Sequence, residues 1–232
     1  MEEKILPNKG KNLIIKVGEK NYERIPIRTH VIKDNDNIIE VVLKYAGPRL
    51  LENDILFISE RVVAITQGRA FPIKDIHPGA LAKFLVKFVH KSPYGIGLGS
   101  EWTMELAVRE AGAARILFAA FCSAVTKPFG MRGVFYKVVG KNINAIDGPC
   151  SYTLAPYNEY AKLGPANPNK VARDIKSRIK NECVIIDAND LGVNVLGRSD
   201  KKITDVFSAA VFKDNPLGQT TEQTPICIVR AV

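Results

Sequence analysis

Two aspartates, Asp147 and Asp187, are the residues of this chain that best suit chemistry on a phosphate. Each follows a short run that could form a strand, residues 142–146 in one case and residues 184–186 in the other. A sheet holds a carboxylate at the end of a strand in a fixed place, and two such carboxylates can converge on one divalent cation that also binds phosphate oxygens. The pair therefore favours phosphate chemistry. The alternative is that each aspartate caps a following turn.

Further oxygen donors follow the second aspartate and precede the last expected strand. Asn189 or Asp190 could add a ligand beside Asp187, and Glu222 lies in the polar loop of residues 218–225. Carboxylate and amide oxygens are hard ligands that suit Mg²⁺ or Mn²⁺. We therefore predict a magnesium or manganese site formed by these segments, although a solvated hairpin turn is the other interpretation of residues 218–225.

The remaining polar residues form no recognisable catalytic motif. His30, His77 and His90 lack the spacing of metal ligands. The glycines of residues 95–99 fit neither a P-loop nor a dinucleotide fingerprint, so a connecting loop is expected there. Thr29 and His30 precede the first expected helix and could approach a ligand or form a turn. No serine has the surroundings of a nucleophile elbow, so the catalytic residues stay unassigned.

Composition indicates a globular protein with a sizeable core, because 46% of the 232 residues are hydrophobic and 25% are charged. No apolar run reaches the roughly 20 residues of a membrane-spanning helix, so we expect no membrane partner. Residues 1–4 are charged and no apolar signal core follows, so a cytoplasmic location is expected. Cys122, Cys183 and Cys227 lie in apolar runs, which favours buried free thiols in a reducing compartment.

The net charge of +9 favours anionic partners such as nucleotides or phosphorylated substrates. Basic residues are densest in residues 170–180, where Val171, Ile175 and Ile179 recur at helical spacing. That pattern is typical of the solvated face of an amphipathic helix. A nucleic-acid interface is the alternative interpretation of this segment, but dispersed basic residues make nucleic acid an unexpected partner.

Strands and helices alternate irregularly, which predicts an α/β (α+β) fold with a mixed sheet and flanking helices. The expected strands are residues 13–17, 54–59, 133–139, 142–146, 183–186, 206–212 and 226–229. The expected helices are residues 38–45, 61–67, 79–88, 103–110 and 169–180, whereas the apolar residues 116–125 suit either type. We expect a single domain over residues 1–232, and if it forms two lobes, a boundary in the loop of residues 92–100.

Several segments, in order, resemble the γ-glutamyl ligases that add glutamate to the deazaflavin coenzyme F420. Residues 144–147, Asn-Ala-Ile-Asp, are similar to the family's Asn-Ala-Gly-Ile-Asp, and residues 185–189, Ile-Ile-Asp-Ala-Asn, to its Ile-Thr-Asp-Thr-Asn. Residues 32–38 resemble its Ile-Lys-x-Gly-Asp-Asp-Leu segment, and residues 53–59 a strand of the pattern Gly-Asp-Val-x-Val-Val. Residues 105–110 resemble a helix before its central sheet. The order and number of these segments make the resemblance specific.

The resemblance implies a homodimer that binds GTP with Mg²⁺ or Mn²⁺ and activates a carboxylate, F420-like or another, as an acyl phosphate. The amine of glutamate then attacks that acyl phosphate. By the same resemblance, the metal ligands are Asp147 and Asp187, with Asn189 and Glu222 as further ligands. The implied nucleotide contacts are Thr29, His30, Glu60, Arg61, Arg69, Gly218 and Gln219.

Some residues depart from the family's pattern. Ile65 stands where the family has a lysine that contacts the nucleotide, and an apolar side chain cannot replace an ammonium group. Cys150 replaces an asparagine, residues 127–141 look longer than usual, and the loop of residues 218–224 keeps little of the family's glycine-rich loop besides Glu222. Arg28, Arg61 or Arg69 could compensate. A ligase-derived binding protein without catalysis is therefore the alternative to an active ligase.

Overall fold

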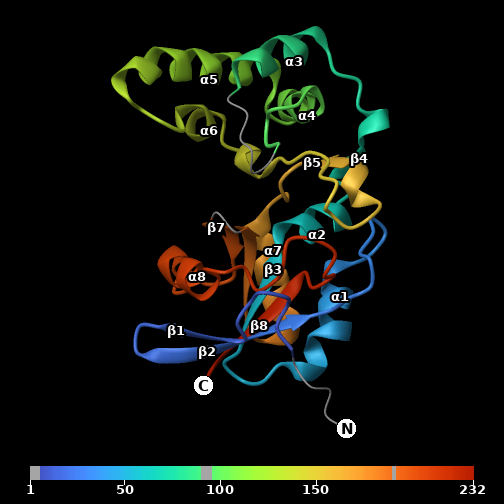
Figure 1. Ribbon diagram of the computed structural model, residues 1–232, viewed down its shortest axis with the longest axis vertical. Coiled ribbons are helices and arrows are strands. Elements are labelled where there is room, and N and C mark those ends of the chain that lie inside the picture. The colour runs from blue at the N-terminus through green and yellow to red at the C-terminus, as the bar shows by residue number, and fades with distance from the viewer. Residues whose placement is uncertain (1–5, 90–95, 190–191) are drawn as a thin grey trace. The chain divides into compact units, whose positions relative to one another are not determined.

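A computed structural model describes residues 6–89, 96–189 and 192–232 (Figure 1). The chain forms two compact units, unit 1 with the residues up to Gly68 together with Pro165–Val232, and unit 2 with Arg69–Gly164. Unit 1 contains a six-stranded sheet and unit 2 a two-stranded one, and helices accompany both. The predicted mixed α/β fold is thus confirmed. Of the segment in which a lobe boundary was expected, residues 96–100 belong to unit 2, and residues 92–95 lie outside the described residues.

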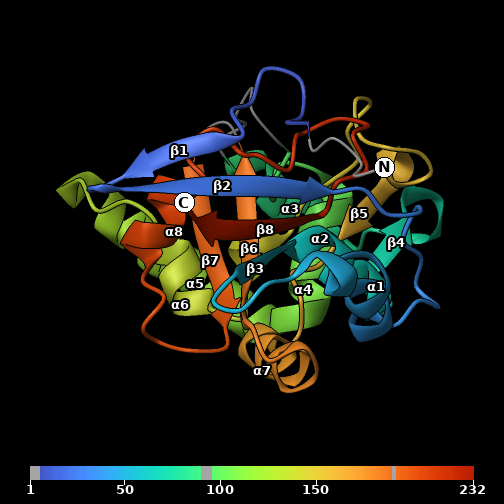
Figure 2. The same ribbon diagram turned by 90° about the horizontal axis from the view of Figure 1, so that it is seen from below.

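The sheet of unit 1 is mixed, with the strand order β1-β2-β8-β3-β6-β7. Only the pair of β3 and β6 is parallel, and the other neighbours are antiparallel. β8 pairs with both β2 and β3, so the last strand of the chain lies beside one of the first (Figure 2). The strands are β1 (Ile14–Val17), β2 (Lys20–Ile27), β3 (Ile55–Ser59), β6 (Glu182–Asn189), β7 (Gly192–Arg198) and β8 (Ile226–Ala231).

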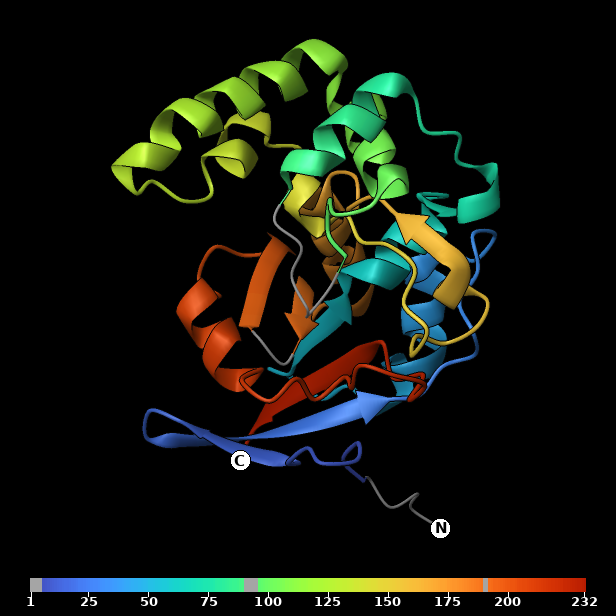
Figure 3. The same ribbon diagram turned by 45° about the horizontal axis from the view of Figure 1, so that its top comes forward.

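Helices cover both faces of this sheet, with α8 and α1 on opposite sides (Figure 3). Side chains alternate along a strand, so Phe57, Val184 and Cys227 pack toward Phe212 at the end of α8, whereas the residues between them face the other side. Among the described residues of unit 1, the α-helices are α1 (Ile38–Tyr45), α2 (Glu60–Thr66), α7 (Pro168–Ile179) and α8 (Asp205–Val211). The predicted helices over residues 38–45, 61–67 and 169–180 are therefore confirmed.

The basic residues of α7 are partly neutralised by carboxylates. Lys170 pairs with Asp174 at 2.6 Å, and Lys176 pairs with Glu182 at 2.5 Å. The Glu182 carboxylate raises the pKa of Lys176 through its hydrogen bond. Such pairing is what the solvated face of an amphipathic helix provides, and it lowers the charge available to an anionic partner.

Arg24 of β2 is a fully buried charge in unit 1. Its guanidinium pairs with Asp214, in the loop after α8, through both terminal nitrogens, and it also donates to the carbonyl of Val211 at 3.2 Å and to that of Asn12. Within the described residues its Nε has no partner. A buried guanidinium with one unsatisfied donor depends strongly on its carboxylate partner.

Unit 2 is mainly helical. Its hydrophobic core includes Met104 and Leu106 of α4, Ile116 and Ala119 of α5, and Ile143. The predicted helices over residues 79–88 and 103–110 are confirmed, and the apolar residues 116–125 form part of a helix. In the part of the chain that the structure describes, no helix is both long and apolar enough to cross a bilayer. The elements are β4 (Ala70–Pro72), α3 (Ala80–Leu85), α4 (Glu101–Ala111), α5 (Ala113–Thr126), α6 (Val134–Val139) and β5 (Tyr160–Lys162).

The strands predicted over residues 133–139 and 142–146 are wrong. Residues 134–139 form α6, and Ile143–Ala145 form a single 3₁₀ turn. Two glycines with positive φ, Gly133 and Gly140, flank α6 and set its ends. The β-branched and aromatic residues between them favour a strand locally, but packing against α5 favours the helix.

The strand predicted over residues 206–212 is also wrong, because these residues form α8. Thr204 caps the helix by accepting a hydrogen bond from the N–H of Phe207 at 3.1 Å, and Asp205 occupies the first turn. Ser208, Val211 and Phe212 are buried at helical spacing. The sequence Thr-Asp before the apolar run was the signal for this helix.

All four cysteines are free, but they differ in accessibility. Cys183 in β6 and Cys227 in β8 are buried, as expected. The same expectation was wrong for Cys122 in α5, which is only half-buried, as is Cys150. Burial raises the pKa of the Cys183 and Cys227 thiols, which disfavours their reactive thiolate form.

In native protein we expect Cys122 and Cys150 to react with a thiol reagent such as DTNB long before Cys183 and Cys227 do. The reason is that the two buried thiols are both inaccessible and held protonated. Absorbance of the released thiolate, followed by mass spectrometry of the labelled peptides, would check this. Equal labelling rates for all four thiols in native buffer would contradict it, and denatured protein provides the fully reactive control.

Candidate functional site

The sheet of unit 1 brings the ends of four neighbouring strands together. Ile226, the first residue of β8, pairs with Ile27, the last residue of β2, and also with Ile58 of β3. Ser59, the last residue of β3, pairs in parallel with Ile186 of β6. The segments that follow β2, β3 and β6 therefore meet the segment that precedes β8, and we call this region the carboxyl end of the sheet. Ligands of open α/β sheets commonly bind outside the carboxyl ends of the strands.

Thr29 and His30 follow β2 at the carboxyl end of the sheet. The N–H of Thr29 donates to the carbonyl of Gln223 at 3.0 Å, which ties this segment to the loop before β8. The His30 ring is held on both nitrogens, by Asp36 at 2.9 Å through Nε2 and by the Tyr45 hydroxyl at 3.0 Å through Nδ1. The imidazole is thereby fixed in place.

Asp36 is a functional candidate that sequence reasoning missed. A hydrogen bond from the N–H of Lys33 lowers its pKa, and the hydrogen bond to His30 lowers it further, although partial burial opposes both. The carboxylate therefore stays ionised and orients the His30 ring. The signal was its place in residues 32–38, one of the segments on which the family resemblance rests.

Glu60 and Arg61 begin α2 immediately after β3, so the sheet positions them directly. Glu60 is buried, with 4% of its surface exposed, and Arg61 is half-buried. On the same helix, Ile65 is 3% exposed and belongs to the core. The position at which a lysine was expected by resemblance is therefore an apolar core position in this chain.

Asp187 does not end its strand, contrary to the sequence prediction. It is the sixth residue of β6 and pairs with Asn194 of β7, one residue beyond the level at which β3 ends. Asn189 ends β6, and its Oδ1 accepts a hydrogen bond from the N–H of Gly192 at 3.1 Å. Asp187 thus lies at the carboxyl end of the sheet with Glu60 and Arg61, whereas Asp190 lies outside the described residues.

The loop of residues 218–225 is shaped by the carboxylate of Glu222. Its Oε2 accepts from the N–H of Thr220 at 2.7 Å, and its Oε1 accepts from the Thr220 hydroxyl at 2.9 Å. A Cβ at Gly218, whose φ is +77°, would come within 2.6 Å of the Glu222 carboxyl carbon. Glycine is therefore required at this position, and Glu222 organises the turn whether or not it also binds a ligand. Gln219, next to Gly218, is half-buried.

Asp147 and Arg69 belong to unit 2. Asp147 follows the 3₁₀ turn and forms a single backbone bridge with Lys162, so it does not end a strand as predicted. Its Oδ1 accepts from the N–H of Gly148 at 2.9 Å. Arg69 pairs with Glu110 at 3.0 Å and donates to the carbonyl of Gly164 at 2.7 Å. Both side chains are thus oriented by groups of unit 2.

Lys162 is a second candidate that sequence reasoning missed. Only 3% of its surface is exposed, and its Nζ donates to the carbonyl of Ala145 at 2.7 Å. Its backbone bridge places it opposite Asp147. The sequence signal was a lone lysine between Ala161 and Leu163, two apolar residues.

The donors available for a cation are oxygens. Asp187, Asn189 and Glu222 offer them in unit 1, and Asp147 offers a carboxylate in unit 2. An oxygen-only set suits a hard cation such as Mg²⁺ or Mn²⁺, and each engaged oxygen keeps a further lone pair. Within the described residues, no group of three or more His, Cys, Asp or Glu side chains is close enough to hold a metal by itself.

Comparison with known protein families identifies a related one. A family model described as F420-0:Gamma-glutamyl ligase matches residues 26–193, which is most of the chain. The matched region includes Thr29, His30, Glu60, Arg61 and Asp187, and it ends before the loop of residues 218–225. No curated protein matches the chain.

Proposed function

The chain belongs to the F420-0:gamma-glutamyl ligase family, and we propose that it joins a substrate carboxylate to the amine of glutamate in an amide bond. In the proposed reaction, a carboxylate oxygen attacks the γ-phosphorus of GTP and GDP leaves. The glutamate nitrogen then attacks the carbonyl carbon of the acyl phosphate, and inorganic phosphate leaves with its electron pair. The substrate carboxylate is F420-like or of another kind.

The observation that carries this proposal is the placement of five of the candidate residues at the carboxyl end of the sheet. Thr29 and His30 follow β2, Glu60 and Arg61 follow β3, and Asp187 lies in β6 just beyond the end of β3. Residues from three separate parts of the sequence are thus positioned by strands of a single sheet. A phosphoryl-transfer site needs such fixed positioning, because catalysis there depends on placement and on electrostatic stabilisation.

We assign a ligand role toward Mg²⁺ or Mn²⁺ to Asp187, and we expect Asp147 to contribute a second carboxylate. Asn189 and Glu222 can each add an oxygen beyond the hydrogen bonds that they already accept. When bound, the cation supplies positive charge against the phosphoryl oxygens. Because carboxylates must be ionised to serve as ligands, cation binding should weaken in acid.

The nucleotide contacts follow from the same arrangement. Arg61 offers a guanidinium at the start of α2, and a guanidinium matches phosphate geometry with paired donors. His30 is held by Asp36 and Tyr45, so its position is fixed before any ligand binds. Gly218 and Gln219 would contribute through the loop that Glu222 shapes. Thr29, Glu60 and Arg69 keep their proposed roles as further nucleotide contacts.

A ligand-binding protein without catalysis is the second candidate function. The burial of Ile65 favours it, because this helix position has no cation to offer a nucleotide and the surrounding core would not admit one. Such a protein would bind GTP or a phosphorylated ligand but would release no phosphate when glutamate and a carboxylate substrate are supplied.

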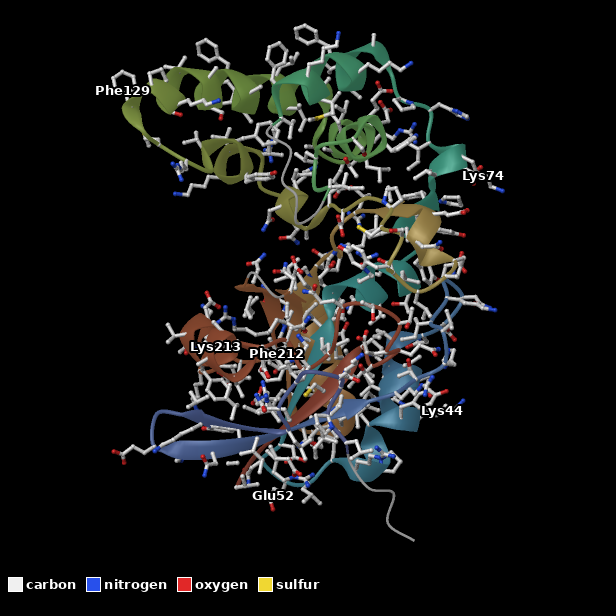
Figure 4. The ribbon with its side chains drawn as sticks, in the orientation of Figure 1. Lys44, Glu52, Lys74, Phe129, Phe212 and Lys213 are labelled. Atoms are coloured by element: carbon white, nitrogen blue, oxygen red, sulfur yellow. The ribbon has the colours of Figure 1, made fainter. Side chains whose placement is uncertain are left out.

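The replacement Asp187→Asn tests the site. We expect calorimetry to show GTP binding by the wild type with Mg²⁺ or Mn²⁺. The variant should bind the metal–nucleotide pair at least about 100-fold more weakly, because replacing a residue that only supports a metal ligand can already lower metal affinity by about that factor. The matched control is Glu52→Gln, which removes an exposed carboxylate before the amino end of β3, at the opposite end of the strand (Figure 4).

Phosphate release in the presence of glutamate and a carboxylate substrate then separates the two candidate functions. Turnover by the wild type that Asp187→Asn abolishes supports the ligase. Nucleotide binding without turnover supports the binding protein, and failure of the wild type to bind nucleotide with either metal rules out the ligase.

A further inference from the structure

Helix α5 of unit 2 carries apolar residues on two faces, although only one face is needed for packing. Ile116 and Ala119 are fully buried in the core of the unit. Leu117, Phe118, Phe121 and Val125 are exposed on the other side, at spacings of three and four residues that keep them along one stripe. Phe118 and Phe121 are 61% and 65% exposed, which is unusual for phenylalanine in a folded unit.

The apolar stripe continues beyond the end of the helix. Phe129, 79% exposed, and Met131, 56% exposed, lie in the turn between α5 and α6. Figure 4 shows Phe129 pointing outward at the end of α5. We call Leu117, Phe118, Phe121, Val125, Phe129 and Met131 together the α5 face. Six exposed large apolar side chains within 15 residues form a concentrated patch, and such patches mark interaction sites.

The charged residues of the segment that contains the α5 face are all positive. Residues 111–146 contain no Asp or Glu, and Arg115, Lys127, Arg132 and Lys137 of this segment are exposed. No acidic side chain of the described residues pairs with Lys127, Arg132 or Lys137. These cations therefore remain available to an anionic partner.

The short helix α3 of the same unit and the 3₁₀ turn that follows it, Val86–Phe88, repeat this composition. Phe84 and Phe88 are exposed and contact each other edge to face with ring centroids 5.1 Å apart, and exposed Lys83 and Lys87 precede them. Residues 76–100 contain no acidic residue either. Figures 1 and 3 show α3 and α5 on the side of unit 2 opposite β4 and β5. Aromatic and basic residues thus occur together on two helices of one side.

We propose that the α5 face binds the surface of an anionic lipid bilayer. An exposed apolar stripe bordered by Lys and Arg is what a helix needs to lie in the boundary between headgroups and acyl chains. The basic residues are attracted to the negative headgroups while the aromatic rings enter the acyl region. At 14 residues, α5 is too short to span the bilayer, so the association is peripheral. The proposal thus departs from the expectation of no membrane partner, which was based only on the lack of a membrane-spanning run.

The same charges disfavour the other occupants of an apolar face. A second copy of this chain would bring one acid-free basic patch against another, and like charges across an interface repel. Nucleic acid would satisfy the cations, but Leu117, Val125 and Met131 have no aromatic ring on which a base could stack. An anionic bilayer satisfies the cations with its headgroups and the aliphatic side chains with its acyl chains.

Flotation with lipid vesicles tests the proposal. We expect the wild type to float with vesicles that contain phosphatidylglycerol, to remain free with pure phosphatidylcholine, and to bind less as salt is raised. Phe118→Ser with Phe121→Ser should weaken vesicle binding by about tenfold or more, because both rings lose their burial in lipid. Lys127→Glu with Arg132→Glu should weaken it as well, through repulsion from the headgroups.

The matched control is Val206→Ser on α8 of unit 1, which removes an apolar side chain that is 80% exposed and lies outside the α5 face. Its vesicle binding should equal that of the wild type. Three outcomes overturn the proposal: no flotation of the wild type with anionic vesicles, wild-type binding by both patch variants, or light scattering that shows a dimer dissociating when the phenylalanines are replaced. If the serine variant does not fold, the charge variant alone decides, because its residues are solvent-exposed.

Discussion

Replacing Asp214 with alanine is expected to lower the free energy of unfolding by about 3 kcal/mol, because it leaves a buried guanidinium without its counter-charge. Arg24 has no solvent exposure, and Asp214 meets both of its terminal nitrogens. The remaining hydrogen bonds of Arg24 go to two backbone carbonyls, which cannot neutralise a full charge. Chemical denaturation of wild type and variant, followed by circular dichroism, measures the loss.

An exposed ion pair provides the control for this prediction. Asp205 pairs with Arg198, but its side chain is 72% exposed, so Asp205→Ala should cost at most about 1 kcal/mol. The double replacement Arg24→Met with Asp214→Ala removes the charge together with its partner. The double variant should lose less free energy of unfolding than the sum of the losses in the two single variants. Additive losses in this cycle, or an Asp214→Ala variant as stable as the wild type, would show that the pair does not act as described.

The same pair predicts how stability depends on pH. Burial tends to raise the pKa of Asp214, but the hydrogen bond from Arg24, the N–H of Asn12 and the positive charge lower it more, so its pKa in the folded protein is below the ordinary value. A carboxyl group with a lowered folded pKa stabilises the protein fully above its unfolded pKa, near 4, and loses that contribution as the pH falls through the folded pKa. The wild type should therefore lose this contribution below about pH 4, whereas Asp214→Ala lacks it at every pH.

Most elements of the fold could be predicted from hydrophobic periodicity and capping residues. Asn37 before α1 is an example, because its side chain accepts from the N–H of Ile39 and begins the helix as the sequence indicates. The failures have a common cause. In α6 and α8, β-branched and aromatic residues favour strands locally, but packing of the helices within each unit decides the outcome. Local preference carries no information about that packing.

The candidate site, too, could be predicted from the sequence only in part. The acidic residue Asp187 was recognisable from sequence because β6 is a strongly apolar strand. The support of His30 by Asp36 and Tyr45 was not, because it depends on how the segment before α1 folds back. Lys162 and the α5 face were also missed. A sequence pattern shows that residues are charged or apolar, but only the fold shows that a lysine is buried and that phenylalanines are exposed.

Gly197→Ala is expected to be among the most destabilising single substitutions in unit 1. A Cβ at Gly197 of β7 would lie 2.3 Å from the carbonyl carbon of Pro168 and 2.7 Å from the backbone nitrogen of Asn169. These atoms belong to the first turn of α7, so no side-chain rotation can relieve the clash. Either α7 must move away from the sheet or β7 must distort, and such overpacking costs about 3 kcal/mol or more.

Gly192→Ala at the start of the same strand is the matched control, because nothing lies within 4 Å of the added Cβ. It should change the free energy of unfolding by less than about 0.5 kcal/mol, as exposed substitutions generally do. The comparison isolates the approach of β7 to α7 from any general effect of alanine on the strand. Equal stability of the two variants would mean that the helix and the strand do not pack as closely as described, whereas a large loss confined to Gly197→Ala would support the position of α7 against the strands that carry Asp187 and its neighbours.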